Sequence, residues 1–146
     1  MKHIIIFFCF IFSSLSYAEQ KQSFGELELH YNTFESTFLL PKIAKQYDFI
    51  RSKGRGLLNV AVIKPSPNKS ELPQSIPAIV TGTVTNLIGQ IVKLDFVTID
   101  EGNAIYYIAA FTKTDDEILR FKVNAKLSAD SAPMAVKFEK HVYVDR

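Results

Sequence analysis

The chain has 146 residues, of which 47% are hydrophobic and 22% are charged, a composition typical of one globular domain with a short appendage. Its 17 Lys and Arg residues against 15 Asp and Glu residues give a formal net charge of +2. A duplex-binding protein gains affinity from a clustered basic face that neutralises several phosphates. A net charge this small gives no reason to expect a nucleic-acid partner.

The N-terminus has the three parts of a secretory signal peptide. A short basic start at residues 2–3 precedes an apolar run at residues 4–12, and small residues at 16 and 18 stand three positions and one position before a cut after Ala18. A membrane span needs about twenty apolar residues, roughly twice the length of this run. We therefore expect residues 1–18 to be removed and residues 19–146 to form a single exported domain without a transmembrane segment.

The chain contains one cysteine, Cys9, and it lies inside this apolar run. Removal of the signal peptide leaves a mature protein without thiols. This excludes disulfides, thiolate metal ligands and cysteine nucleophiles together. The hydrophobic core alone must then stabilise the domain, which is feasible because a domain of this size buries about two-thirds of its unfolded surface.

Polar and apolar side chains alternate with a period of two through most of the remaining sequence, a pattern typical of half-buried β-strands. Residues 104–112 differ, because they are apolar on both sides, as a central strand covered on both faces would be. The predicted strands are 26–31, 58–62, 80–85, 92–96, 104–112, 119–125 and 136–144.

The segments between these strands carry turn signals and one helix signal. Residues 101–103 and 114–117 are short and polar enough to close antiparallel hairpins. Residues 65–77 hold four of the six prolines and are predicted to form an exposed loop. A two-turn helix is predicted at Pro41–Tyr47, since proline is tolerated in a first helical turn.

About seven antiparallel strands without cysteines predict an all-β protein, an immunoglobulin-like β-sandwich with one short helix between the first two strands. A closed soluble barrel is the alternative arrangement.

Residues that carry catalysis or metal binding are sparse. The mature chain has two histidines, His30 and His141, which lie far apart in the sequence on predicted polar strand faces, so we expect no metal site and no cofactor. Ser52 does not stand in a Gly-x-Ser-x-Gly elbow. A hydrolase would need the fold to bring Ser52 or another hydroxyl within about 3 Å of one imidazole. The sequence therefore favours a protein that is not an enzyme.

Five cations stand between residues 42 and 55, against the single acid Asp48. Such a segment suits an acidic protein surface or anionic lipid headgroups. A solvated connection explains it too, because exposed loops are normally charged. The glycines at 54 and 56 lack the spacing of a nucleotide-binding loop. The five cations are Lys42, Lys45, Arg51, Lys53 and Arg55.

Aromatic residues cluster between residues 24 and 49. Most are expected in the core, because aromatic side chains bury large areas. Alternatively, Phe34, Phe38 or Tyr47 lines an apolar cleft beneath the helical segment that holds a small molecule or lipid.

Residues 25–60 contain several distinctive motifs, with which the chain resembles a family of small exported proteins of gammaproteobacteria that is catalogued as a domain of unknown function. The resemblance implies a Gram-negative source and a periplasmic location, and it supplies no activity and no catalytic residues. Its motifs are His30-Tyr31-Asn32-x-Phe34-x-Ser36-x-Phe38-Leu39, Pro41-x-Ile43-Ala44-x-x-Tyr47, Ile50-Arg51-Ser52 and Gly56-Leu57-Leu58-Asn59-Val60.

The leading hypothesis is a periplasmic, non-catalytic β-sandwich that binds another envelope protein or a peptide through residues 34–56. A structural role competes with binding, because Arg51 or Asn32 would also tie this segment to the sheet by hydrogen bonds. The candidate binding residues are His30, Asn32, Lys45, Arg51, Ser52 and Arg55.

Overall fold

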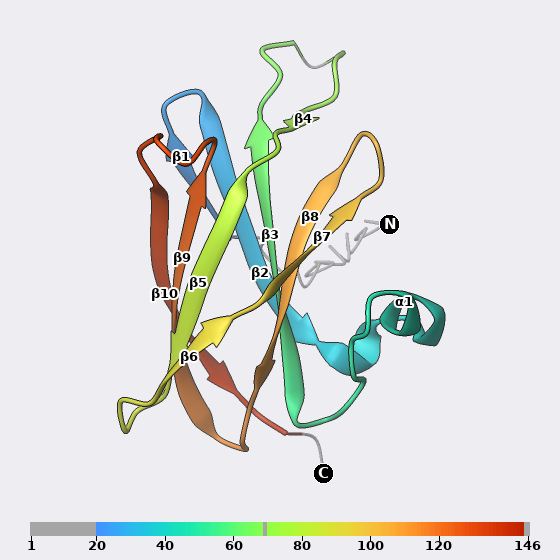
Figure 1. The fold of residues 1–146 in the computed structure, drawn as a ribbon, viewed down its shortest axis with the longest axis vertical. Helices are drawn as coiled ribbons and strands as arrows, with labels where there is room; N and C mark the ends of the chain where they lie inside the picture. Colours follow the sequence, from blue (N-terminus) through green and yellow to red (C-terminus); the bar gives the residue numbers. More distant parts are fainter. Residues whose placement is uncertain (1–19, 69, 145–146) are drawn as a thin grey trace, which may run out of the picture.

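The computed structural model describes residues 20–68 and 70–144, and it consists mainly of two antiparallel β-sheets that share one core (Figure 1). The predicted signal peptide, residues 1–18, lies outside the described residues. No helix in the described part of the chain is long and apolar enough to cross a membrane.

One sheet has six strands and the other has four, and all neighbouring strands run antiparallel. The predicted β-sandwich is therefore confirmed. The six-stranded sheet has the order β1 (Gln20–Phe24), β2 (Leu27–Glu35), β3 (Arg55–Lys64), β8 (Ile105–Thr112) and β7 (Phe96–Asp100), with β4 (Gln74–Ser75) paired to β3. The four-stranded sheet has the order β10 (Met134–Val142), β9 (Glu117–Lys126), β5 (Ile79–Thr85) and β6 (Ile91–Leu94).

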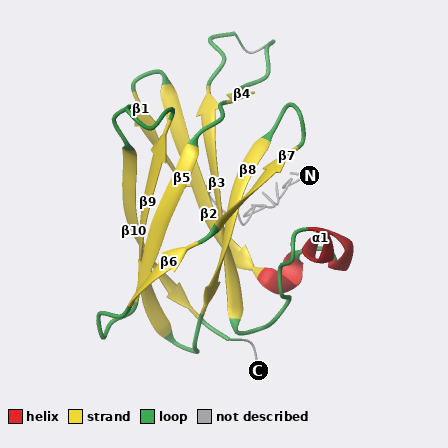
Figure 2. Ribbon diagram, viewed as in Figure 1, coloured by secondary structure: helices red, strands yellow, loops and turns green. Residues whose placement is uncertain are grey.

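The described helical structure lies between β2 and β3 and comprises a 3-10 turn, η1 (Ser36–Phe38), and α1 (Pro41–Gln46) (Figure 2). We call residues 36–54 the excursion. Pro41 occupies the first turn of α1, where its missing N–H costs no intrahelical hydrogen bond.

The main core lies between the two sheets. Inward residues of both sheets build it, among them Leu29 and Leu58 from the six-stranded sheet and Phe121 from the other. Four aromatic rings join the sheets in a chain: Tyr31 stacks on Phe138 with centroids 4.6 Å apart, Phe138 on Phe121 at 4.9 Å, and Phe121 meets the edge of Phe111 at 5.0 Å.

A second, smaller apolar cluster covers part of the outer face of the six-stranded sheet. Its buried members are Leu57, Ile99 and Ile108, and side chains of the excursion pack on them. Strand β8 therefore buries both of its faces, since Tyr107 points into the main core while Ile108 points into the second cluster. The prediction of a central strand at 104–112, covered on both sides, is confirmed.

The described residues contain three more strands than the sequence pattern predicts. One is the two-residue β4, which pairs with β3 at the end of the segment 65–77 that was predicted to be a loop and is too short to show an alternation. Strand β1 is mostly exposed and polar, so it shows no apolar alternation, and its presence places the helix between the second and third strands. The predicted strand at 92–96 belongs to a path that changes sheets at Asp95, because Leu94 ends β6 and Phe96 begins β7.

Candidate functional site

The excursion is held in place by hydrogen bonds between its two ends. Ser36 is fully buried; its Oγ donates to the carbonyl oxygen of Ser52 at 2.8 Å and accepts from the backbone N–H of Ser52 at 2.9 Å. Arg51 Nη2 donates to the carbonyl oxygen of Thr37 at 2.8 Å. These bonds bring residues 50–52 against residues 36–38.

The outer surface of the excursion combines exposed apolar side chains with cations. Phe38, Leu40 and Ile50 are 71%, 69% and 57% exposed. Among the predicted site residues, Lys45 and Arg51 belong to this surface and both are exposed. We call these exposed side chains of the excursion, taken together, the excursion patch; they are Phe38, Leu40, Lys42, Lys45, Ile50 and Arg51.

Ser52 and Arg55 occupy structural positions at the end of the excursion. Ser52 Oγ accepts a hydrogen bond from the N–H of Gly54 at 3.2 Å, and Arg55 begins β3 opposite Thr112. Gly56 faces the ring of Phe111, and a Cβ atom there would lie 2.3 Å from the ring carbon Cζ. Close packing thus explains the glycine at this position.

His30 and Asn32 lie on β2, outside the excursion. They alternate with the core-facing Leu29 and Tyr31, so they lie on the outer face of the six-stranded sheet. His30 Nε2 lies 2.7 Å from Glu28 Oε2. This hydrogen bond is the main reason that the pKa of Glu28 lies below its ordinary value, and Lys21, 3.5 Å away, lowers it further.

Asn32 stands directly opposite Asn59 on β3, a residue that the sequence interpretation did not select. Asn59 Oδ1 is buried and has no hydrogen-bond partner among the described residues. A buried polar atom without a partner is rare in native proteins. The signal available in the sequence was a single asparagine within the otherwise apolar run 57–63.

The aromatic residues beneath the excursion are packed. Phe34 and Tyr47 pack against the second apolar cluster, together with Leu39 and Phe49. Phe38 instead faces solvent. These contacts fill the space under the excursion, so they favour the core interpretation over an apolar cleft.

His141 lies between two polar partners near the C-terminus. Its Nε2 is 2.6 Å from Asp116 Oδ1, its Nδ1 is 3.1 Å from the Tyr143 hydroxyl, and its ring stacks on Tyr143. The side chains of His141 and Asp116 are 45% and 75% exposed, so water is not excluded from this group. Among the described residues, the hydrogen bonds of Ser52 join it to Ser36, Gly54 and Arg55, and none reaches an imidazole.

Within residues 20–68 and 70–144, no group of three or more His, Cys, Asp or Glu side chains is placed to hold a metal ion. The hydroxyl–imidazole pair described above is formed by a tyrosine and lies open on the surface.

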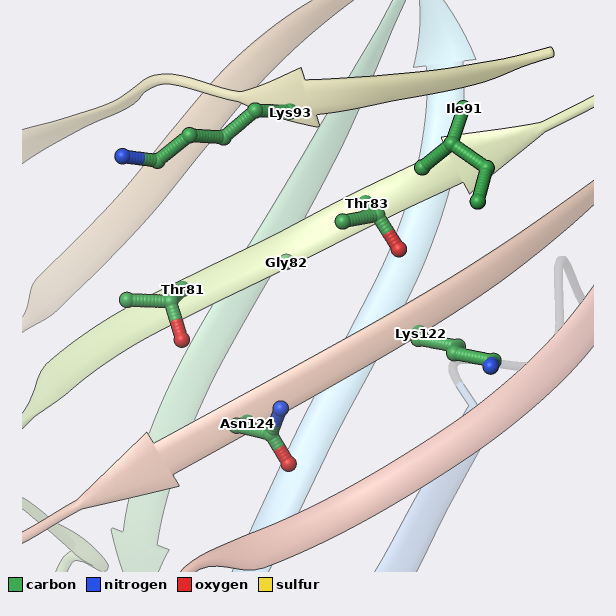
Figure 3. A pocket seen from close by; sticks show the side chains of 7 residues that line it. All are labelled: Thr81, Gly82, Thr83, Ile91, Lys93, Lys122 and Asn124. Carbon is green, nitrogen blue, oxygen red and sulfur yellow. The ribbon is translucent and has the colours of Figure 1, made fainter.

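A shallow groove lies on the outer face of the four-stranded sheet, on the other side of the sandwich from the excursion (Figure 3). Lysines and threonines of three neighbouring strands border it. The sequence interpretation did not select these residues, because the alternation shows which side chains share a face but not which strands are neighbours. The lining residues are Thr81, Gly82, Thr83, Ile91, Lys93, Lys122 and Asn124.

The family model "Domain of unknown function (DUF4426)" matches residues 21–145, so the chain belongs to this family. A solved structure of a DUF4426 family protein from Pseudomonas aeruginosa is 33% identical, with 88% of this chain and 97% of that chain covered and a TM-score of 0.74. The resemblance noted in the sequence is thus confirmed.

FetP of uropathogenic Escherichia coli, recombinantly expressed in the periplasm, is 13% identical, with 88% of this chain and 95% of that chain covered and a TM-score of 0.57. A copper-bound variant of FetP has the same identity, with 87% and 96% covered and a TM-score of 0.59. At this identity the likeness shows the β-sandwich fold alone. No curated protein matches the sequence.

Proposed function

We propose that this protein is a non-catalytic binding module of the cell envelope that holds a partner protein through the excursion patch. The observation that carries the proposal is the exposure of Phe38, Leu40 and Ile50 beside Lys45 and Arg51. Aromatic residues and arginine dominate the binding energy of protein interfaces. A contiguous exposed apolar surface rimmed by charge is typical of an interaction site.

The fixed backbone of the excursion supports this role. The bonds from Ser36 and Arg51 hold the segment in one conformation before any partner arrives. A preorganised loop loses less conformational entropy on binding than a mobile one. In this proposal Lys45 and Arg51 contact the partner, while Ser52 and Arg55 position the excursion.

The outer face of β2 forms the continuation of this site in our proposal. His30 and Asn32 lie there, and the buried oxygen of Asn59 stands opposite Asn32. Because Asn59 Oδ1 is buried, an incoming peptide N–H group would reach it only after the side chains that cover it move. We expect His30 and Asn32 to make the direct contacts of this face and to add specificity.

An envelope location agrees with the signal-peptide pattern of residues 1–18, after whose removal residues 19–146 form the mature domain in this proposal. The expression of FetP, a protein of the same fold, in the periplasm is consistent with it. The expected partner is another envelope protein or a peptide.

Photo-crosslinking in living cells tests the proposal. The reactive residue is placed in turn at Phe38, Lys45 and Arg51, and mass spectrometry identifies the adduct. We expect one discrete protein adduct from these positions and none from Leu72, which is 85% exposed in the loop after β3.

Substitution then separates recognition from chance proximity. We expect Lys42→Glu, which reverses a charge of the excursion patch and leaves the Arg51–Thr37 bond intact, to abolish the adduct formed from Lys45, while Lys64→Glu, an equal charge change at an exposed position of β3, leaves it unchanged. Absence of adducts at all three positions, in protein that is folded and exported, would overturn the proposal.

A further inference from the structure

Three lysines form one row across the outer face of the four-stranded sheet. Lys137 of β10 stands directly opposite Lys122 of β9; Lys122 is opposite Thr83 of β5, and Thr83 is opposite Lys93 of β6. We call Lys93, Lys122 and Lys137 the lysine row. None of the three lysine side chains has an ion pair or hydrogen bond within the described part of the chain, and all three side chains are exposed.

Such an arrangement works against the fold, because like charges directly opposite each other on neighbouring strands are destabilising. Glu139, the acid on the strand positions of this face, is already paired with Arg120 at 2.9 Å, and the exposed Asp95, two residues after Lys93, forms no ion pair with it in the described part of the chain. Asp116 and Glu117, which precede and begin β9, bond to His141 and to the hydroxyl of Thr114. The positive charge of the lysine row therefore remains available to an external anion.

An apolar hairpin tip lies beside the row. Leu87 and Ile88, in the connection between β5 and β6, are 63% and 80% exposed, and Ile91, the first residue of β6, is 68% exposed. We call these three residues the apolar tip. Ile91 precedes Lys93 by two residues on β6, so the tip begins about 7 Å from the row.

The tip has a fixed conformation. The Asn86 carbonyl oxygen accepts from the N–H of Gly89 at 3.1 Å, Asn86 Oδ1 accepts from the N–H of Gln90 at 2.9 Å, and Gly89 has a φ of +85°. Leu87 and Ile88 occupy the corners of this turn, where turn chemistry favours Asn, Asp, Gly or Pro. Two large apolar residues are thus presented to solvent by a rigid turn.

We infer that the apolar tip and the lysine row together bind the surface of an anionic phospholipid bilayer. The tip enters the boundary between headgroups and acyl chains, and the lysines face the phosphates. Apolar side chains combined with a lysine-rich face are the features that hold proteins at this boundary. Lys93, about 7 Å from Ile91, lies within the screening length of about 8–10 Å at physiological salt, and Lys122 and Lys137 continue the positive charge across the face.

The residue types favour a bilayer over a protein as the occupant. Lysine is depleted in protein interfaces, where arginine and aromatic residues are enriched, and threonine is rare among their dominant residues. This surface has Lys93, Lys122 and Lys137 with intervening threonines and no aromatic residue among the groove residues. It is also independent of the excursion patch, which lies on the other sheet (Figure 1).

The chain contains no tryptophan, which allows a single reporter at the tip. The protein is expressed from the whole sequence, and its N-terminus is determined by mass spectrometry. Ile88→Trp is mixed with vesicles of phosphatidylethanolamine containing about one quarter phosphatidylglycerol. We expect its fluorescence to shift to shorter wavelength as the indole leaves water. No shift is expected for Leu72→Trp, in the connection between β3 and β4, which lies at the opposite end of the sandwich from the connection between β5 and β6 (Figure 1).

Co-sedimentation with the same vesicles tests the two components separately. We expect Leu87→Ser/Ile88→Ser and Lys122→Gln/Lys137→Gln each to weaken binding about tenfold or more. The controls Leu72→Ser and Lys64→Gln should bind as the wild type does. Higher salt should release the wild type, because it screens the lysines.

Three outcomes would overturn the inference: no sedimentation of the wild type with anionic vesicles, equal binding to vesicles of phosphatidylcholine alone, or unchanged binding of both double variants. These residues are exposed, so the variants should fold, and circular dichroism checks that they do. Loss of vesicle binding with retained crosslinking of the excursion patch would separate this inference from the proposed function.

Discussion

Two ion pairs of nearly equal length have very different surroundings. Lys113 Nζ lies 2.7 Å from Glu35, and its side chain is 2% exposed; it also donates to the carbonyl oxygen of Tyr143. Arg120 Nε lies 2.9 Å from Glu139, and both side chains are about 60% exposed. Burial therefore decides how much each pair contributes, because water screens the exposed pair and not the buried ammonium.

We expect Lys113→Ala to lower the free energy of unfolding by about 2–4 kcal/mol, since it removes the partner of Glu35 and of a backbone carbonyl. Arg120→Ala should change it by about 1 kcal/mol or less. Urea denaturation of the two variants measures both values. Equal losses would show that burial does not distinguish the pairs.

The ionisation of Glu28 makes the stability of the fold depend on pH. The hydrogen bond from His30 holds the pKa of Glu28 below its ordinary value of 4.5 in the folded protein. A carboxyl whose folded pKa is lowered stabilises the fold above its unfolded pKa, and this contribution is lost as the pH falls through the folded pKa. The contribution of Glu28 is therefore present at neutral pH and disappears below about pH 4.5.

In a titration followed by NMR, His30→Ala should raise the pKa of Glu28 toward its ordinary value, because it removes the largest cause of the shift. Lys21→Ala should raise it less, since the charge and hydrogen bond of Lys21 are smaller causes. A larger rise for Lys21→Ala would contradict the assigned order of causes.

At the scale of elements, the excursion depends on one buried hydroxyl. Ser36 bonds to both the N–H and the carbonyl of Ser52, so Ser36→Ala leaves the N–H without its partner and the carbonyl oxygen with the N–H of Arg55 alone. We expect a loss of about 1–3 kcal/mol and faster amide hydrogen exchange within residues 36–54. Exchange in β9 should change far less, and a uniform increase across both sheets would show that the excursion does not open on its own.

Some helices and strands of this protein could be predicted from the sequence and others could not. The short helix was predictable because proline marks its first turn, and the doubly buried β8 because its apolar residues do not alternate. Strand β1 was not, since its exposed polar residues resemble a loop. The change of sheet at Asp95 was hidden because Leu94 and Phe96 continue one alternation while pairing in different sheets.

The candidate site was predictable to a similar degree. The cations of the excursion are visible in the sequence, and Lys45 and Arg51 are both exposed in the structure. Strand pairing hid the lysine row and the buried oxygen of Asn59, because both depend on which residues stand opposite each other. The register between strands that are distant in sequence depends on the tertiary structure, and the alternation within one strand does not reveal it.

For the whole molecule, the aromatic chain from Tyr31 to Phe111 couples the sheets. Phe121 is 1% exposed at its centre. We expect Phe121→Ala to cost about 3–5 kcal/mol, a large fraction of the 5–15 kcal/mol typical of a domain, and to lower the stability of both sheets in one transition.

The matched control is Phe38→Ala, which removes the same side chain at a site that is 71% exposed. It should change the free energy of unfolding by about 0.5 kcal/mol or less, because that ring contributes little buried area. Denaturation followed by circular dichroism compares the two. A large loss for Phe38→Ala would place that ring in the core and would also weaken the case for the excursion patch.

The edge of the four-stranded sheet bears on how the protein behaves at high concentration. Lys140 on β10 stands opposite Leu119 on β9, at a position that the alternation assigns to the inner side of the sheet. The side chain of Lys140 is nevertheless exposed. A strand from a second molecule that extended the sheet at this edge would have to cover that ammonium group with apolar side chains. Inward-pointing charge on an edge strand opposes such pairing. We therefore expect Lys140 to oppose the polymerisation of the protein into fibres by pairing of edge strands.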